Sequence, residues 1–243
     1  MPSHAPAVKP ARAPAAVPPR ASFPRVFHGS VGTKILIGST GLALVLYLVI
    51  HVAGNMMVFF GPEVFNKYAY TLEGNPLIPV VEIGLLIVFL VHVFKTITMF
   101  LTNQQARPVR YVQKKYAGRP SRKTFASSTM IFSGLWLLVF IVVHVRAFRY
   151  GAEYQWPGGG RDLYRLEMEN FSHPWTVAFY VLSMLVVGSH LWHGASSAFQ
   201  SLGVEGARWT PRLLAGGRLV AVLIASAFIA IAVWAFLAPR AGT

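Results

Sequence analysis

The sequence contains no cysteine and little negative charge. Its 243 residues include 8 Asp and Glu against 22 Lys and Arg, a formal net charge of +14 at pH 7. Without cysteine, the chain cannot form disulfides, thiolate-bound iron–sulfur clusters, a cysteine nucleophile or the covalent link of a c-type haem. Any haem bound by this chain must therefore be held without a covalent bond, as a b-type haem is.

The sequence also lacks the patterns of soluble enzymes. It has no Gly-rich nucleotide loop after a strand, no paired carboxylates and no nucleophile with a base in helical register. The positive charge does not indicate nucleic acid, because the basic residues lie in segments that flank apolar stretches. Membrane topology and anionic lipid headgroups explain such charges better. We therefore expect contact with membrane lipid and no nucleic-acid partner.

Apolar residues are abundant instead. The chain is 54% hydrophobic and 12% charged, with a mean hydropathy of +0.51, which is too apolar for one soluble domain. Five apolar stretches are long enough to cross a bilayer, so we predict an all-α integral membrane bundle of five helices joined by loops, within a membrane domain over 28–240. The expected spans are about 35–60, 77–101, 126–148, 174–200 and 214–237.

Charge predicts the orientation of these spans. Residues 1–27 are rich in Pro and Ala, basic and free of acids, and they lack the apolar segment of a secretory signal. We interpret them as a disordered cytoplasmic tail. Residues 102–125 contain seven Lys or Arg and no acid, which places this loop and the N-terminus in the cytoplasm. The loop that ends near residue 173 contains four acids and is expected outside.

The first four spans each contain a histidine about two-thirds of the way along: His51, His92, His144 and His190. An imidazole inside a hydrocarbon-length helix is costly to desolvate and needs a partner. Neutral imidazole is a common axial ligand of electron-transferring haem, so four such residues predict two bis-histidine b-type haems. The alternative is that the histidines are packed and bonded to neighbouring serines or carbonyls.

Depth in the membrane predicts which histidines form pairs. Odd spans run outward and even spans run inward, and each histidine lies late in its span. His51 and His144 therefore lie toward the outer side, and His92 and His190 toward the cytoplasm. Segments 41–52 and 134–145 also share Gly, Leu, Leu, Val, His and Val at equivalent positions. This internal repeat indicates that the first and third spans present the same face to the same kind of group.

The fourth ligand has a competitor in His193. His190 and His193 are about 60° apart around a helix, so both cannot approach one iron from the same side. Gly194 lies one turn after His190 and leaves room for a flat porphyrin, which favours His190. His193 then serves as the alternative ligand, or as a group that bonds a haem propionate, a carbonyl or a quinone.

Three further residues are candidates for proton exchange with a quinone. Glu82 is the only carboxylate inside an apolar stretch, which is typical of a proton-handling group. An interfacial glutamate that reaches water is the alternative. His28 and Lys34 lie at the interface just before the first span and could act on the cytoplasmic side.

The combined pattern resembles a known family. Five spans, four intramembrane histidines and the runs ARPVRY (106–111) and HLWHGASSAFQSLG (190–203) resemble the cytochrome b558 subunit of succinate dehydrogenase. That subunit is a two-haem membrane anchor, also found in some fumarate reductases, and the resemblance covers about residues 27–237. It implies that His92 and His190 hold the haem proximal to the dehydrogenase, and that His51 and His144 hold the distal haem.

The resemblance also implies partners and a place in the cell. A flavoprotein that oxidises succinate and an iron–sulfur subunit would bind at the cytoplasmic face of a bacterial inner membrane. This chain would carry no catalytic residue for succinate and would pass electrons to membrane quinone, frequently menaquinone. Complexes of this kind often associate further. The alternatives are a di-haem cytochrome of another quinone-linked dehydrogenase, and a haem-free transporter or anchor.

Overall fold

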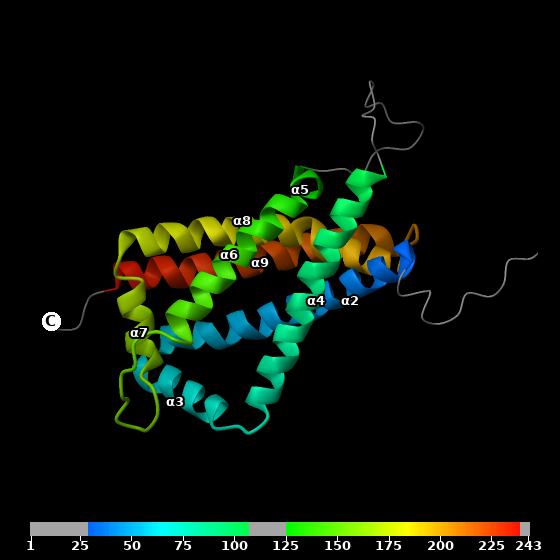
Figure 1. Ribbon diagram of the computed structural model, residues 1–243. Coiled ribbons are helices and arrows are strands. Elements are labelled where there is room, and N and C mark those ends of the chain that lie inside the picture. The colour runs from blue at the N-terminus through cyan, green and yellow to red at the C-terminus, as the bar shows by residue number, and fades with distance from the viewer. Residues whose placement is uncertain (1–28, 107–124, 239–243) are drawn as a thin grey trace, which may run out of the picture.

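The computed structural model describes residues 29–106 and 125–238, and these are almost entirely helical (Figure 1). The described residues contain no β-sheet, and a single isolated bridge joins Gln155 to Arg161. The elements in chain order are α2 (Ser30–Asn55), the 3-10 helix η1 (Met56–Phe60), α3 (Pro62–Glu73), α4 (Ile78–Gln105), α5 (Phe125–Ser128), α6 (Met130–Phe148), α7 (Leu163–Asn170), α8 (Pro174–Ser201) and α9 (Trp209–Leu237).

Five helices are long and apolar enough to cross a membrane: α2 together with η1, then α4, α6, α8 and α9. Even the shortest, α6, has 19 residues, close to what a hydrocarbon core about 30 Å thick requires. The predicted class, an all-α bundle with five membrane-length helices, is confirmed. The observed helix ends differ from the predicted ones by up to five residues, as at α9, which begins at Trp209 rather than near 214.

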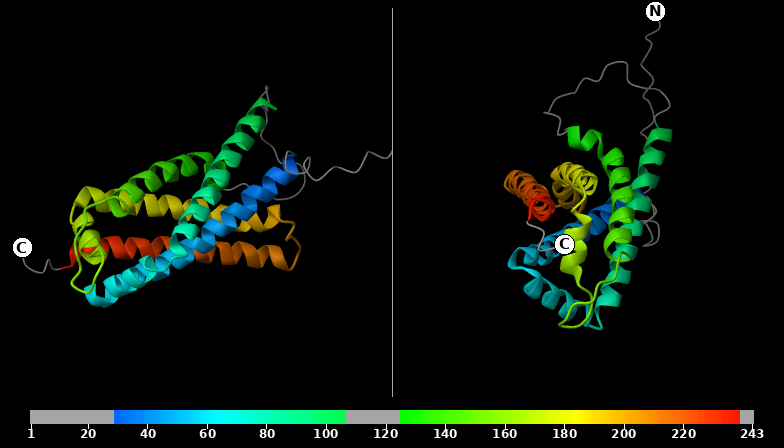
Figure 2. Two further views of the ribbon diagram at one scale, coloured as in Figure 1. Left: turned by 60° about the horizontal axis from the view of Figure 1, so that its bottom comes forward. Right: turned by 90° about the vertical axis from the view of Figure 1, so that its left-hand side faces the viewer.

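The long helices form a layered bundle. Helices α8 and α9 lie side by side and antiparallel, α6 and α2 pack against α8, and α4 crosses α2 at a steep angle (Figures 1 and 2). Helix α4 packs chiefly against α2, and none of its residues is buried. The core therefore lies along α8 and α9, with α4 at its edge.

Small residues allow the α8–α9 pair to approach closely. A Cβ added to Gly188 of α8 would lie 3.1 Å from the Cβ of Ala225 on α9. In hydrocarbon no hydrophobic force drives helices together, so close packing over small residues has to do so. On α8 the buried apolar residues recur at intervals of three and four: Val177, Tyr180, Met184, Val187 and Leu191.

The bundle has two distinct ends. One end, which we name the α7 end, holds α7, α3, the end of α2 and the start of α8 (Figure 1). The other, the α5 end, holds α5 and the starts of α2 and α9. Charge predicts that the α7 end is outside and the α5 end is cytoplasmic. The tail, His28 and most of the basic segment 102–125 lie outside the described residues.

Two connections that we expected to be loops contain helices. Gly61 has a φ of 90°, which ends η1, and Pro62 then begins α3 with Phe65 and Ala69 buried. Asp162 caps α7 by accepting a hydrogen bond from the backbone N–H of Arg165 at 2.9 Å. The expectation was wrong here because short amphipathic helices lack the long apolar runs that identify a span.

A buried asparagine joins these two short helices. Asn66 of α3 is fully buried. Its Nδ2 donates to Asp162 Oδ1 at 2.7 Å, and its Oδ1 accepts from the backbone N–H of Tyr164 at 2.9 Å. One amide therefore fixes α3, the cap of α7 and the first turn of α7 relative to each other.

Replacing Asn66 with Ala should destabilise the α7 end. The change leaves the Tyr164 N–H without its partner, which costs about 1–3 kcal/mol if the group is buried, and it removes one of the two hydrogen bonds to Asp162 Oδ1. We expect a lower midpoint of thermal unfolding in detergent and faster proteolysis within 149–162. Lys67→Ala, at the exposed neighbouring position, is the control, and equal behaviour of the two variants would contradict the role of Asn66.

Candidate functional site

The structure brings His51 and His144 together. The two rings come from α2 and α6, near the α7 end, with centres 5.9 Å apart and planes at 86°. Aromatic side chains surround them: Tyr47 stacks on His51 at 5.2 Å, and Phe140 stacks on His144 at 5.5 Å. Phe228 of α9 approaches His51 at 5.6 Å. This pair therefore lies among rings contributed by three long helices, α2, α6 and α9.

The other two histidines lie nearer the α5 end. His92 of α4 and His190 of α8 are close enough for their side chains to interact electrostatically. Each has a hydroxyl at its Nδ1: Thr40 Oγ1 lies 3.1 Å from His92 Nδ1, and Ser133 Oγ lies 2.9 Å from His190 Nδ1. The hydroxyls come from α2 and α6, the same helices that carry His51 and His144.

These hydroxyls are compatible with one arrangement of the imidazole protons. Thr40 Oγ1 lies 2.6 Å from the carbonyl of Leu36, to which it can donate its hydrogen. Ser133 Oγ likewise lies 3.0 Å from the carbonyl of Met130. With these hydrogens on the carbonyls, each hydroxyl oxygen accepts from Nδ1–H, and Nε2 keeps its lone pair. A neutral ring with a free Nε2 and a bonded Nδ1–H is the form that ligates metals.

The partners at the α7 end are of a different kind. Tyr180 OH lies 3.2 Å from His144 Nδ1, and Asn55 Nδ2 lies 3.4 Å from His51 Nδ1. Asn55 also donates to the backbone carbonyl of His51 at 2.8 Å. A phenol can donate or accept, so Tyr180 accommodates either tautomer of His144. All four histidines thus have a polar neighbour at Nδ1.

The internal repeat extends one residue further than its shared letters indicate. Thr40–Gly41 and Ser133–Gly134 occupy equivalent positions, eleven and ten residues before His51 and His144. A Cβ on Gly41 would lie 3.2 Å from His92 Cε1, and one on Gly134 would lie 3.7 Å from His190 Cε1. Each copy of the repeat therefore contacts one histidine of the pair nearer the α5 end, His92 or His190. Each copy also contains one histidine of the pair nearer the α7 end, His51 or His144.

Sequence reasoning missed both hydroxyls. The repeat was recognised from its identical letters, and Thr and Ser are not identical. The usable signal was a Ser or Thr inside an apolar span, directly before the shared glycine in both copies.

The paired histidines fit a cofactor that needs two protein ligands. Metal–imidazole bonds are about 2 Å long, so two rings on one metal have centres roughly 6 Å apart, as His51 and His144 do. Within the described residues, no group of three or more His, Cys, Asp or Glu could hold a bare metal ion. A metal bound by only two side chains needs further ligands, and a porphyrin supplies four.

The remaining candidates lie apart from the two pairs. His193 is half-buried, and within the described residues its ring has no hydrogen bond, whereas Ser133 bonds His190. Glu82 is half-exposed near the α7 end, with its carboxylate 3.5 Å from the guanidinium of Arg149. Lys34 is exposed in the first turns of α2. The ion pair was not anticipated, because Arg149 follows the end of the third predicted span.

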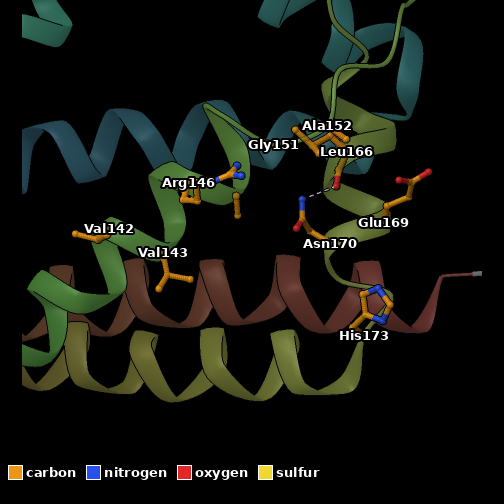
Figure 3. Close-up of a pocket in the computed structure, with 10 residues that line it drawn as sticks. Val142, Val143, Arg146, Gly151, Ala152, Leu166, Glu169, Asn170 and His173 are labelled. Carbon is orange, nitrogen blue, oxygen red and sulfur yellow. Dashed lines mark hydrogen bonds between the residues drawn. The ribbon is translucent and has the colours of Figure 1, made fainter.

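A pocket of about 520 Å³ opens at the α7 end, between α6, α7 and the start of α8 (Figure 3). It lies on a different face of α6 from His144, so it does not adjoin the histidine pair. Apolar side chains form one wall and polar ones its rim. The lining residues are Val142, Val143, Arg146, Ala147, Gly151, Ala152, Leu166, Glu169, Asn170 and His173.

Comparison with protein-family models, characterised proteins and solved structures finds no match to this chain. The functional argument therefore depends on the residues and their geometry. The two pairs of histidines, with their polar partners at Nδ1, are the feature that any function has to explain.

The two repeat glycines should respond differently to alanine. Alanine favours a helix by about 1 kcal/mol over glycine, so Gly134→Ala should be neutral or stabilising. Gly41→Ala should destabilise by roughly 1–3 kcal/mol, because its methyl group would press on His92. Thermal unfolding of the purified protein in detergent measures both, and equal shifts would contradict the close contact at Gly41.

Proposed function

We propose that this chain is the membrane-anchoring cytochrome b subunit of a succinate dehydrogenase, the respiratory complex II. In this proposal it binds two b-type haems and carries electrons from an iron–sulfur subunit to membrane quinone, with menaquinone favoured. The observation that carries the proposal is the arrangement of four intramembrane histidines in two pairs, each with a polar partner at Nδ1. Bound haem would supply one-electron transfer at each pair.

The side chains of this chain have separate tasks in the proposal. His92 and His190 offer Nε2 as ligands at the proximal site, while Thr40 and Ser133 orient their rings and increase their basicity. His51 and His144 offer ligands at the distal site. Because the two pairs lie toward opposite ends of the bundle, they mark a path for electrons across the membrane.

The partners follow from what the chain lacks. It has no group that could oxidise succinate, so a flavoprotein and an iron–sulfur subunit would do so at the cytoplasmic face, next to the α5 end. Quinone reduction takes up two protons for two electrons. Glu82 is the candidate donor near the α7 end, and His28 and Lys34 are the candidates near the α5 end.

Co-purification tests the proposal. A tagged chain isolated from its native membrane should retain a covalently flavinylated subunit and an iron–sulfur subunit, with succinate–dye reductase activity. Retention of a formate- or hydrogen-oxidising enzyme would instead assign the chain to another quinone-linked dehydrogenase. A reduced-minus-oxidised spectrum without a haem band would support a haem-free transporter or anchor.

Ligand substitutions should remove one haem at a time. His92→Ala or His190→Ala should eliminate the proximal haem, and His51→Ala or His144→Ala the distal haem. Haem content should fall from two to one per chain in each variant, and the lost spectral component should be the same within each pair. His193→Ala is the matched control and should keep both haems. Retention of two haems by any of the four variants would contradict the assignment.

A further inference from the structure

The α7 end contains a buried carboxyl group that the proposed electron path does not use. Glu167 of α7 is 4% exposed, and within the described residues its carboxyl group makes no hydrogen bond. An ionised carboxylate in such a place is strongly disfavoured. Burial accordingly raises the pKa of Glu167 to about 8. The group can therefore change its protonation state near physiological pH, which an exposed glutamate does not do.

The helix that carries Glu167 contacts the surroundings of the histidine pair through Phe171 and Tyr180. Its charge acts on Tyr164, in its own helix, and on Tyr180 of α8. Phe171, one turn after Glu167, packs edge-on against Tyr180 at 5.0 Å between ring centres. Tyr180 OH then lies 3.2 Å from His144 Nδ1. Phe171 and Tyr180 therefore connect the helix that carries the buried carboxyl to a candidate ligand of the distal haem.

Burial, rather than a neighbouring charge, controls the titration of Glu167. Helices α3, α6 and α9 pack on α7, and α8 reaches Glu167 through Tyr180. The buried residues of α3 carry no ionisable group, and α9 has none after Arg218. Helix α6 contributes His144 on this side and also Arg146, which lines the pocket together with Leu166 and Glu169 of α7. On α7 itself, Arg165 and Glu169 are exposed and paired with each other at 3.0 Å, and Glu169 also accepts from Tyr154. Asp162 is engaged with Asn66.

We propose that Glu167 is the proton-exchanging group of the α7-end histidine pair: it binds one proton when an electron arrives there and releases it when the electron leaves. This inference rests on the proposed function, in which the iron–sulfur partner supplies the electron. The proton comes from the aqueous phase at the α7 end, since α7 lies at the surface and exposes Arg165 and Glu169. At a pH above the pKa of Glu167 in the oxidised state, each electron gained is matched by up to one proton on the carboxylate, which offsets the added charge.

Electrostatics determines the sign of the coupling. An added electron makes the site more negative and strengthens proton binding at Glu167. By linkage, protonation of Glu167 favours reduction to the same extent. The midpoint potential of the distal haem should therefore decrease as pH rises through the range in which Glu167 titrates. The proximal haem, at the other end of the bundle, should show no such dependence.

Redox titrations of the purified complex from about pH 6 to about pH 10 test the inference. In the Glu167→Gln variant, the midpoint potential of the distal haem should be independent of pH. It should equal the wild-type potential at low pH and be more positive than the wild-type potential at high pH. Glu169→Gln, which neutralises an exposed acid two residues away, is the control and should behave as the wild type does. The haem that is lost in His144→Ala identifies the distal component.

Infrared difference spectra provide a readout that needs no variant. Reduction of the wild-type distal haem at high pH should produce the carbonyl band of a protonated carboxylic acid. If Glu167→Gln fails to retain haem, the absence of this band in the wild type still overturns the inference. Two haems with midpoints independent of pH would overturn this inference alone. A purified chain without haem would overturn the proposed function as well, so the two failures are distinguishable.

Discussion

An imidazole inside hydrocarbon must have a partner for each of its nitrogens, and this requirement organises the whole bundle. Each of the four intramembrane histidines has a hydroxyl or amide at Nδ1, donated by a helix turn or by a neighbouring helix. At His92 and His190 the partner is a hydroxyl oxygen, which can accept from Nδ1–H and leave Nε2 with its lone pair, whereas at His51 it is an amide N–H that donates to Nδ1. In the proposed function, the free Nε2 atoms of His92 and His190 would bind haem iron.

The repeat satisfies this requirement with few residues. Helices α2 and α6 each carry a hydroxyl–glycine pair at one level and a histidine about ten residues later, at the other level. At about 1.5 Å per residue, the two levels within a helix are roughly 15 Å apart. A shift of either helix along its axis would disturb both pairs at once. The registers of α2 and α6 are therefore fixed by two separate sets of contacts.

The sequence predicted the features that depend on long patterns. Hydropathy predicted five apolar helices, and alternating span direction predicted that His51 would lie at the depth of His144. It did not predict α3 or α7, whose single buried faces are too short to stand out, nor the link through Asn66. The burial of Glu167 was equally hidden, because α7 is a short, largely polar segment and only the fold covers the carboxyl. Thr40 and Ser133 were visible but appeared to be ordinary small polar residues of a span.

Of the four intramembrane histidines, the one on α4 has the least support from buried protein around it. None of the residues of α4 is buried, and the helix packs chiefly against α2, so protein contacts alone hold His92 weakly. Thr40 of α2 lies 3.1 Å from its ring, and Gly41 leaves room for that ring, since a Cβ there would lie 3.2 Å from His92 Cε1. A cofactor bound between His92 and His190 would join α4 directly to α8, in the core of the bundle. Since a ligand stabilises the state that binds it, the position of α4 and the proximal cofactor should stabilise each other. In the proposed function, a helix with no buried residue would thus be held in part by what its histidine binds.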